Sequence, residues 1–234
     1  MNLFFAPTFK EGIYHLPEEE SKHIVRVLRM KRGDSVFLTD GLGNMTEASI
    51  VETASKHCTV KTIITLTEYE KRPFHLHIAI APTKNTDRFE WFLEKATEIG
   101  IDVITPLICS HSERTHLKTD RLQKVIIAAM KQSLKAYLPF LEEPVKFTRF
   151  IQSPFDGEKF IAQCSQDDPV ELKNIYRKGA NTLILIGPEG DFSPEEIDLA
   201  KKHGYVPISL GKSRLRTETA GIVACHTVNL VNSE

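Results

Sequence analysis

Beyond residue 74 the chain alternates between short apolar runs and longer amphipathic stretches, and this alternation limits the possible folds more than any other feature. The apolar runs predict strands at 75–81, 103–109, 159–163, 182–186 and 206–210. The amphipathic stretches predict helices at 86–99, 120–137, 194–203 and 218–231. Strands that alternate with helices are typical of an α/β domain with a mostly parallel sheet.

The first 70 residues have a different pattern. Short β-rich runs at 35–39, 48–51 and 58–67 are separated by turn-forming residues such as those at 40–44, which predicts a small β-barrel or sandwich. One helix is expected to begin near Pro17 and to stop before Gly33. The charged segment 68–73 predicts a linker, so we expect two domains, at 1–70 and 74–234.

Composition excludes several classes of protein. The formal net charge is −1, so a nucleic-acid partner would bind a local basic patch and not an overall basic field. The chain contains no run of about 18 apolar residues and begins without a basic secretory leader, which predicts a cytoplasmic protein without membrane spans. The four cysteines are widely spaced and the histidines lack partners at ligand spacing, which predicts free thiols and no metal site.

The turn at residues 187–191, which reads GPEGD, follows an apolar strand. The next residues, Ser193, Pro194 and Glu196, predict a capping box at the start of a helix. The carboxyl end of a parallel strand is where open α/β sheets bind ligands, although a purely structural turn would explain the glycines equally well. Glu189 and Asp191 would repel a polyphosphate, so a cofactor with an amine and a sulfonium, such as S-adenosyl-L-methionine, suits the turn better.

A second strand passes through a glycine turn into a helix at residues 210–220, which read LGKSRLRTETA. This turn carries two arginines, Arg214 and Arg216. Two consecutive strand-to-helix turns are expected to form two walls of one pocket.

These two turns, together with other segments, resemble the RsmE family of bacterial 16S ribosomal RNA uridine N3-methyltransferases in the SPOUT superfamily. Residues 27–34 resemble the family's N-terminal signature, and residues 84–100 resemble its central helix. Gln132 and Ser133 also fit, so the resemblance covers nearly the whole chain. The chain departs from the family at Leu3 and Lys135, where members often have arginine, and at Asp191, where they often have glycine.

The resemblance implies a fold and a cofactor. The expected fold is α/β, with a C-terminal SPOUT trefoil-knot domain and a small N-terminal PUA-like or OB-like β-barrel. S-adenosyl-L-methionine would bind in the knot, and a homodimer would complete the site. The resemblance assigns cofactor binding to Leu185, Ile186, Gly187, Glu189, Gly190, Leu210, Gly211, Leu215, Thr219 and Ala220.

The implied substrate is 16S ribosomal RNA or the small ribosomal subunit. Uridine N3 carries a proton and is a poor nucleophile until it loses that proton. Arg216 is the candidate for stabilising negative charge on the base or for binding its phosphate. Glu218 is a candidate base, with two alternatives: it orients Arg216, or it caps the last helix.

A run of basic residues in the N-terminal domain predicts an RNA contact. On an α-helix, Lys22, Arg26 and Arg29 would lie within an arc of roughly 60°. Arg32 and the more distant Lys84 complete the predicted RNA-binding set. A solvated helix face is the alternative interpretation.

Three other functions remain open. A different SPOUT enzyme would methylate another RNA position, and a non-catalytic RNA-binding module would need neither glycine turn. A nucleotide-binding metabolic enzyme is disfavoured by the acidic turn. The last helix is apolar around much of its girth, through residues such as Ala220, Val223, Ala224 and Leu230, which predicts that a partner subunit covers part of it.

Overall fold

The computed structural model describes residues 1–54, 57–163 and 170–233, which form two compact units. The first unit contains Met1–Lys71 and Met130–Leu138. The second contains Arg72–Ala129 and Pro139–Glu234. None of the helices in these described residues is both long and apolar enough to cross a membrane.

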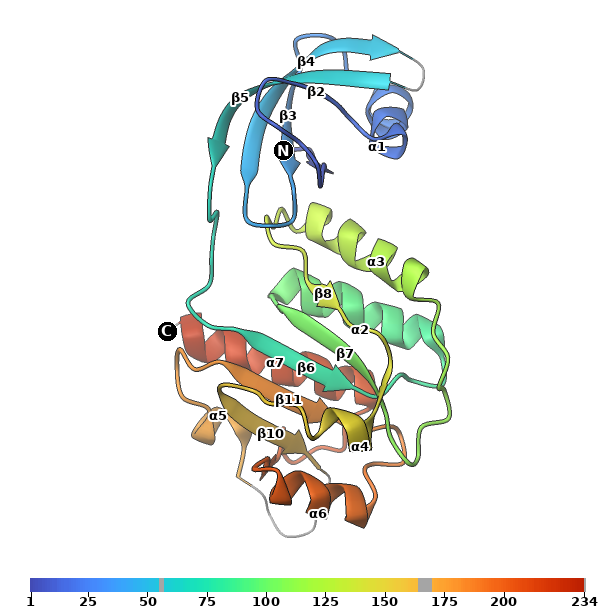
Figure 1. The fold of residues 1–234 in the computed structure, drawn as a ribbon, viewed down its shortest axis with the longest axis vertical. Helices are drawn as coiled ribbons and strands as arrows, with labels where there is room; N and C mark the ends of the chain where they lie inside the picture. Colours follow the sequence, from blue (N-terminus) through green and yellow to red (C-terminus); the bar gives the residue numbers. More distant parts are fainter. Residues whose placement is uncertain (55–56, 164–169, 234) are drawn as a thin grey trace. The chain divides into compact units, whose positions relative to one another are not determined.

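The first unit is built on a five-stranded sheet with the order β1-β3-β4-β5-β2 (Figure 1). Neighbouring strands are antiparallel except for β1 and β3, which are parallel. The core of the unit includes Phe4, Leu38, Ile50 and Val60, all nearly inaccessible to solvent. The strands are β1 (Leu3–Phe5), β2 (Ile13–His15), β3 (Ser35–Thr39), β4 (Met45–Ala54) and β5 (His57–Leu66).

The turn between β3 and β4 confirms the predicted hairpin connection. Asp40 accepts hydrogen bonds from the backbone N–H groups of Leu42 (2.7 Å) and Asn44 (3.3 Å). Gly43 has a φ of 101°, and a Cβ atom there would lie 2.4 Å from the ring of Tyr137. Any larger residue at this position would collide with that ring, so the turn requires glycine.

The helix of the first unit is shorter than predicted. It consists of α1 (Glu18–Lys22), and a π-helical turn, η1 (His23–Val27), follows it directly. Arg29 then adopts a left-handed backbone conformation with a φ of 53°, which ends the helical path. The prediction that Lys22, Arg26 and Arg29 share one face of an α-helix is therefore wrong. The helix changes from α-helical to π-helical at His23 and ends before Arg29.

The segment Met130–Leu138 belongs to the first unit although it follows a helix of the second. Lys131 Nζ lies 2.6 Å from Glu20 Oε1, and the carbonyl of Ala136 accepts hydrogen bonds from Thr39 and Gly43. The helix α3 (Thr119–Gln132) ends five residues earlier than predicted. Leu134, with a φ of 58°, takes the chain out of the helix into this packing arrangement.

The second unit confirms the predicted parallel sheet. Its seven strands follow the order β12-β10-β11-β6-β7-β8, with β9 also paired to β7, and every pairing is parallel. The strands are β6 (Leu76–Ile80), β7 (Val103–Ile108), β8 (Phe140–Leu141), β9 (Val145–Lys146), β10 (Glu158–Ala162), β11 (Thr182–Ile186) and β12 (Val206–Ile208).

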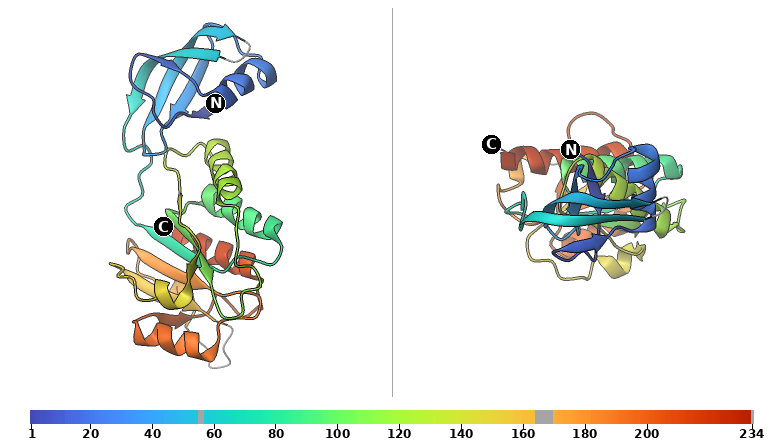
Figure 2. Two further views of the ribbon diagram at one scale, coloured as in Figure 1. Left: turned by 45° about the vertical axis from the view of Figure 1, so that its right-hand side comes forward. Right: turned by 90° about the horizontal axis from the view of Figure 1, so that it is seen from above.

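Helices cover both faces of this sheet (Figures 1 and 2). On one face, α2 (Thr86–Ile99) packs against α7 (Thr217–Ser233), and Gly221 of α7 lies directly against Phe92 and Ile80. On the other face, α4 (Phe147–Phe150) and α6 (Pro194–Lys202) enclose an apolar cluster with alternate residues of the central strands. The remaining short helix is α5 (Leu172–Ile175).

Local signals in α2 fixed its bounds. The side chain of Asn85 caps the helix by accepting a hydrogen bond from the N–H of Asp87 (2.9 Å), and Gly100 ends it with a φ of 127°. Phe89 and Phe92 of this helix are fully buried, whereas Trp91 is exposed. Cys58, Cys109 and Cys225 are buried free thiols, as predicted, and Cys164 lies outside the described residues.

His77 forms a buried polar contact within the second unit. Its Nε2 lies 2.6 Å from Thr105 Oγ1, and its ring stands edge-on to Phe150 at 5.7 Å between centroids. Burial, together with a smaller effect of His75, lowers the pKa of His77 from 6.5 to about 3. His77 therefore stays neutral in the folded protein at pH values where the unfolded chain protonates it.

We expect His77 to weaken the fold in acid. As the pH falls from 6.5 toward 3, the unfolded state gains a proton that the folded state does not bind, so stability is lost over that range. His77→Gln keeps a hydrogen-bonding group without the titration. The free energy of unfolding of the wild type relative to this variant should fall by about 1.4 kcal/mol per pH unit below pH ~6. Urea titrations at several pH values measure this, and a difference independent of pH would contradict it.

Candidate functional site

The first predicted turn leaves the carboxyl end of β11, at the centre of the parallel sheet. The predicted capping box is confirmed: Glu196 N donates to Ser193 Oγ (3.2 Å), and Ser193 N donates to Glu196 Oε2 (2.9 Å). This cap fixes the start of α6 and thereby holds the turn in place. Pro188 is buried in the turn, whereas Glu189 and Gly190 are exposed.

Asp191 explains one departure from the family pattern. Its φ is 62°, in the left-handed region where glycine is the least strained residue. Aspartate tolerates this conformation better than most side chains, and Asp191 Oδ1 accepts a hydrogen bond from the N–H of Phe192 (2.8 Å). The turn therefore keeps its shape without a glycine at this position.

The two glycines of the turn are closely packed. A Cβ atom at Gly187 would lie 3.0 Å from the ring of Phe192, and one at Gly190 would lie 3.2 Å from His111 Cβ. Packing within the protein thus restricts both positions. Their predicted role in close backbone approach to a cofactor remains a prediction.

The second predicted turn follows β12, and the structure brings it against the first. Thr217 Oγ1, at the start of α7, donates a hydrogen bond to the carbonyl of Gly187 (3.1 Å). Ser209 Oγ holds the turn at Gly211, which has a φ of 115°. The two strand-to-helix turns are therefore joined at the same edge of the sheet.

A cavity of about 140 Å³ lies beside the second turn. Leu210, Gly211 and Thr227 line one part of it, and Glu171, Leu172 and Lys173 line another. Leu210 and Gly211 belong to the predicted cofactor-binding set. The lining residues around α5 carry no recognisable motif, and sequence reasoning did not identify them.

The remaining predicted cofactor residues are distributed over the same two turns. Leu185 and Ile186 are buried in β11, where the backbone pairs with β10 on one side and β6 on the other. Glu189 Oε1 accepts a hydrogen bond from the backbone N–H of Lys84 (3.0 Å), which links the first turn to the loop after β6. Leu215, Thr219 and Ala220 are half-buried at the start of α7.

Glu218 is the most unusual side chain at this site. It is 6% exposed, yet its Oε2 has no hydrogen-bond partner among the described residues. Its charged neighbour is Arg88 of α2, whose Nε lies 3.9 Å from Glu218 Oε1. A buried carboxylate oxygen without a donor is costly, so a ligand that donates a hydrogen bond here would be stabilised.

Arg216 precedes Glu218 by two residues in the sequence, whereas Arg88 lies beside the Glu218 carboxylate only in the structure. Arg216 is exposed in the loop just before α7, and its carbonyl accepts a hydrogen bond from the N–H of Ala220 (2.8 Å). Sequence reasoning did not identify Arg88, because nothing in the primary structure indicates that residue 88 meets residue 218.

The predicted RNA-binding residues fall in both units. Lys22 pairs with Glu18 at 2.7 Å, whereas Arg26, Arg29 and Arg32 are exposed and form no ion pair within the described part of the chain. Lys84 lies in the second unit and pairs with Glu113 at 2.8 Å. The histidines considered as metal ligands have other partners: His111 Nδ1 lies 3.0 Å from the carbonyl of Asp191, and His116 Nδ1 lies 3.0 Å from Thr115 Oγ1.

Two family models match the chain. The model described as an RNA methyltransferase domain matches residues 70–229, and the one described as an RNA methyltransferase PUA domain matches residues 16–63. Ribosomal RNA small subunit methyltransferase E of Synechocystis sp. is 31% identical over 228 residues, which cover 94% of this chain and 73% of the relative.

Solved structures resemble the whole chain. A probable rRNA-methyltransferase from Porphyromonas gingivalis is 41% identical with a TM-score of 0.93, covering 100% of this chain and 99% of its own. A ribosomal RNA small subunit methyltransferase E from Neisseria gonorrhoeae, bound to S-adenosyl methionine, is 25% identical with a TM-score of 0.87 and covers 96% of this chain and 95% of its own.

Proposed function

Because the chain belongs to the RNA methyltransferase family that includes ribosomal RNA small subunit methyltransferase E, we propose that it methylates N3 of a uridine in 16S ribosomal RNA. The predicted resemblance to this family and the predicted SPOUT fold with a PUA-like N-terminal domain are confirmed. The enzyme is an S-adenosyl-L-methionine-dependent ribosomal RNA methyltransferase. The position on the base, the residues that act and the assembly are parts of the proposal.

The observation that carries the proposal is the buried Glu218 carboxylate with its unpartnered oxygen. Uridine N3–H is a hydrogen-bond donor whose proton must leave before the nitrogen can attack a methyl group. In this proposal Glu218 Oε2, which has no hydrogen-bond partner among the described residues, accepts that proton. Arg88 Nε lies 3.9 Å from Glu218 Oε1, so the proposal pairs Arg88 with that oxygen and assigns proton acceptance to Oε2.

The two turns and the adjoining cavity offer polar and acidic groups that suit a cationic cofactor. Cofactor binding is assigned to the predicted residues, with Leu210 and Gly211 placing backbone groups beside the cavity of about 140 Å³. When bound, S-adenosyl-L-methionine supplies an electrophilic methyl group. Glu189 adds an acidic environment that favours a cationic ligand over a polyphosphate.

Arg216 has a separate role in this proposal. It is exposed in the loop just before α7, where a guanidinium can reach the RNA. Its charge and its planar donors suit a uracil oxygen that becomes negative as N3 loses its proton. A base that pairs through N3 must be unpaired or extruded to reach this position.

RNA binding is assigned to both units. Arg26, Arg29 and Arg32 of the first unit, with Lys22 beside them, would contact phosphates, and Lys84 would do so in the second unit. The family of the first unit, an RNA methyltransferase PUA domain, supports this assignment. We place the activity in the cytoplasm, where ribosomal RNA is found.

A homodimer is part of the proposal. α7 presents a partly exposed stripe of Ala220, Val223, Thr227 and Leu230, and Leu230 is 48% exposed. The same helix begins at the loop that carries Arg216 and Glu218. A second copy packed on the α7 stripe would bury it and fix that loop.

The test is mass mapping of 16S ribosomal RNA from cells with and without the gene. We expect one uridine to carry a methyl group at N3 only when the gene is present, and the purified protein to restore it with S-adenosyl-L-methionine. A methyl group on another atom or nucleotide would select a different SPOUT activity. RNA binding without methyl transfer would select the non-catalytic module.

A further inference from the structure

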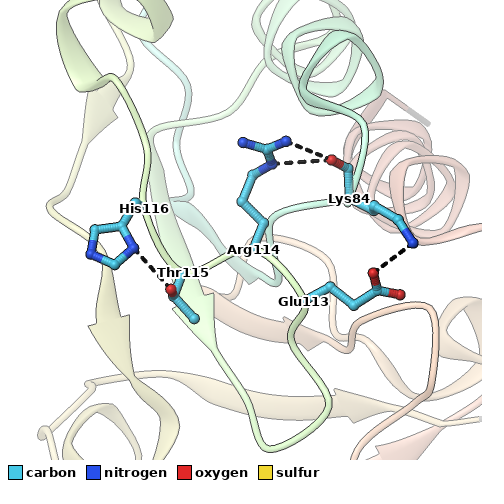
Figure 3. A pocket seen from close by; sticks show the side chains of 5 residues that line it. All are labelled: Lys84, Glu113, Arg114, Thr115 and His116. Carbon is cyan, nitrogen blue, oxygen red and sulfur yellow. Dashed lines mark hydrogen bonds and ion pairs between the residues drawn. The ribbon is translucent and has the colours of Figure 1, made fainter.

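A second, larger cavity of about 360 Å³ lies in the second unit, away from Gly211. It is lined by Lys84, which follows β6, and by Glu113, Arg114, Thr115 and His116, which follow β7 (Figure 3). β6 and β7 are parallel neighbours, so their following loops meet at the same edge of the sheet as the turn at residues 187–191. Glu189 fastens that turn to Lys84.

Hydrogen bonds hold the Arg114 side chain in place. Its Nε (3.1 Å) and Nη2 (2.8 Å) both donate to the carbonyl of Lys84, as Figure 3 shows. Its Nη1 makes no hydrogen bond among the described residues. The guanidinium is thus fixed by two bonds while a cationic donor group stays available, so little side-chain entropy would be lost when it binds an anion.

The ion pair of Lys84 with Glu113 is weak enough for a stronger anion to displace Glu113. Its Nζ lies 2.8 Å from Glu113 Oε2, and the two side chains are 74% and 57% exposed. An exposed ion pair of this kind contributes only about 0–1 kcal/mol. A dianionic or multidentate oxygen ligand can therefore replace Glu113 as the partner of Lys84 at small cost.

The lining indicates the class of ligand. All five lining residues are polar or charged, and the small imidazole of His116 is the one aromatic ring among them. Two cations beside a hydroxyl and an imidazole suit the oxygens of a phosphate and a ribose. The volume lies within the range of about 300–1,000 Å³ found for small-ligand sites.

We infer that this cavity binds one sugar-phosphate unit of the RNA strand beside the target uridine, through Arg114 and Lys84, and that Glu113 competes with the phosphate for Lys84. The inference rests on the proposed function, because it assumes that the strand enters at this edge of the sheet. Competition by Glu113 weakens the contact with isolated phosphates. An RNA strand that also places its uridine at Glu218 makes further contacts with the protein. These contacts allow its phosphate to displace Glu113 from Lys84.

Two substitutions with opposite expected effects test the inference. Arg114→Ala should weaken binding to transcribed 16S ribosomal RNA roughly tenfold, and should reduce the slope of log K against log salt by about 0.7, the loss of one phosphate contact. Glu113→Gln should tighten binding several-fold because it frees Lys84. A purely structural role for Glu113 would not give tighter binding.

Arg177→Ala is the matched control. Arg177 is 80% exposed and pairs with Glu158 at 2.6 Å, at the start of β10 and thus at the opposite edge of the parallel sheet. This variant removes the same charge and should leave affinity and salt slope unchanged. Fluorescence anisotropy gives the RNA affinity, and calorimetry with S-adenosyl-L-methionine reports whether the cofactor site is intact.

The outcomes separate this inference from the proposed function. A wild-type enzyme that methylates RNA, together with an Arg114→Ala variant of unchanged affinity and slope, would overturn only the phosphate site. Weaker binding in Glu113→Gln would also overturn it. Loss of cofactor affinity in Arg114→Ala would mean that the cavity serves the cofactor and not the RNA. Failure of the wild type to methylate RNA would instead overturn the proposed function.

Discussion

Replacing Glu218 with glutamine is expected to lower the rate constant of methyl transfer by about 10²–10⁴-fold, the usual contribution of a general base. Glutamine has nearly the same shape, but its amide cannot take the N3 proton. Removing a buried carboxylate that has one distant charged partner should not weaken the fold, because the cost of burying the charge is also removed. The measurement is single-turnover transfer of a tritiated methyl group to 16S ribosomal RNA.

Glu195→Gln serves as the control for this substitution. Glu195 also lies in the first turn of a helix, but it is exposed at the start of α6. This variant should keep full activity. If Glu218→Gln retained wild-type turnover while Glu195→Gln did the same, Glu218 would be a helix-capping residue and would leave the catalytic proposal.

Substitutions of Arg88 test the pairing of Arg88 with Glu218 independently. If it only positions Glu218, Arg88→Lys should keep much of the turnover, because a cation remains beside Oε1, and Arg88→Ala should lose it. Affinity for RNA should be similar in both variants. A parallel loss of RNA affinity would instead assign Arg88 to substrate binding.

Elements with complete local signals were predictable from the sequence. α2 was predicted with its observed bounds because Asn85 and Gly100 mark its two ends. The capping box of α6 was predicted from Ser193 and Glu196 alone. β11 was predicted because Thr182 is followed by four consecutive apolar residues, a pattern typical of a strand buried on both faces of a parallel sheet.

Elements that depend on distant contacts were not predictable in this way. α3 has helical spacing up to Tyr137, but residues 134 and 137 belong to the core of the first unit with Leu3, Met45 and Ala136, so the helix ends early. The π-helical turn at His23–Val27 has no pattern of its own in the sequence. At the candidate site, the glycine turns were identified as motifs, whereas the contact of Arg88 with Glu218 depends on packing between α2 and α7.

The same packing exposes one side of α7 and buries the other. Gly221, Ala224, Cys225 and Val228 face the sheet and α2 and are inaccessible or nearly so. The sequence showed that α7 is apolar around much of its girth, and the structure leaves the α7 stripe only partly covered. Because exposure of an apolar stripe to water is unfavourable, a self-complementary contact between two copies would bury the stripe and stabilise the adjoining loop that carries Arg216.

We therefore expect Val223→Arg and Leu230→Arg to convert a dimer into monomers with little or no methyl transfer. An arginine in the middle of a two-fold contact would place two like charges close together without water. Leu230 lies two turns of α7 beyond Val223 and outside the cavity lining, so its substitution separates assembly from direct damage to the cofactor site. Sedimentation gives the mass of the assembly, and the tritiated-methyl assay gives turnover.

Two control variants show whether lost activity comes from loss of the dimer or from general damage to the protein. Val206→Arg introduces the same charge at a residue of β12 that is 41% exposed, and it should remain dimeric and active. Arg216→Ala should remain dimeric and bind cofactor but lose turnover, because it removes a group that acts on the base and not one that packs. A wild-type monomer with full activity would refute the dimer mechanism. Full turnover in Arg216→Ala would remove Arg216 from the catalytic residues even if the dimer were present.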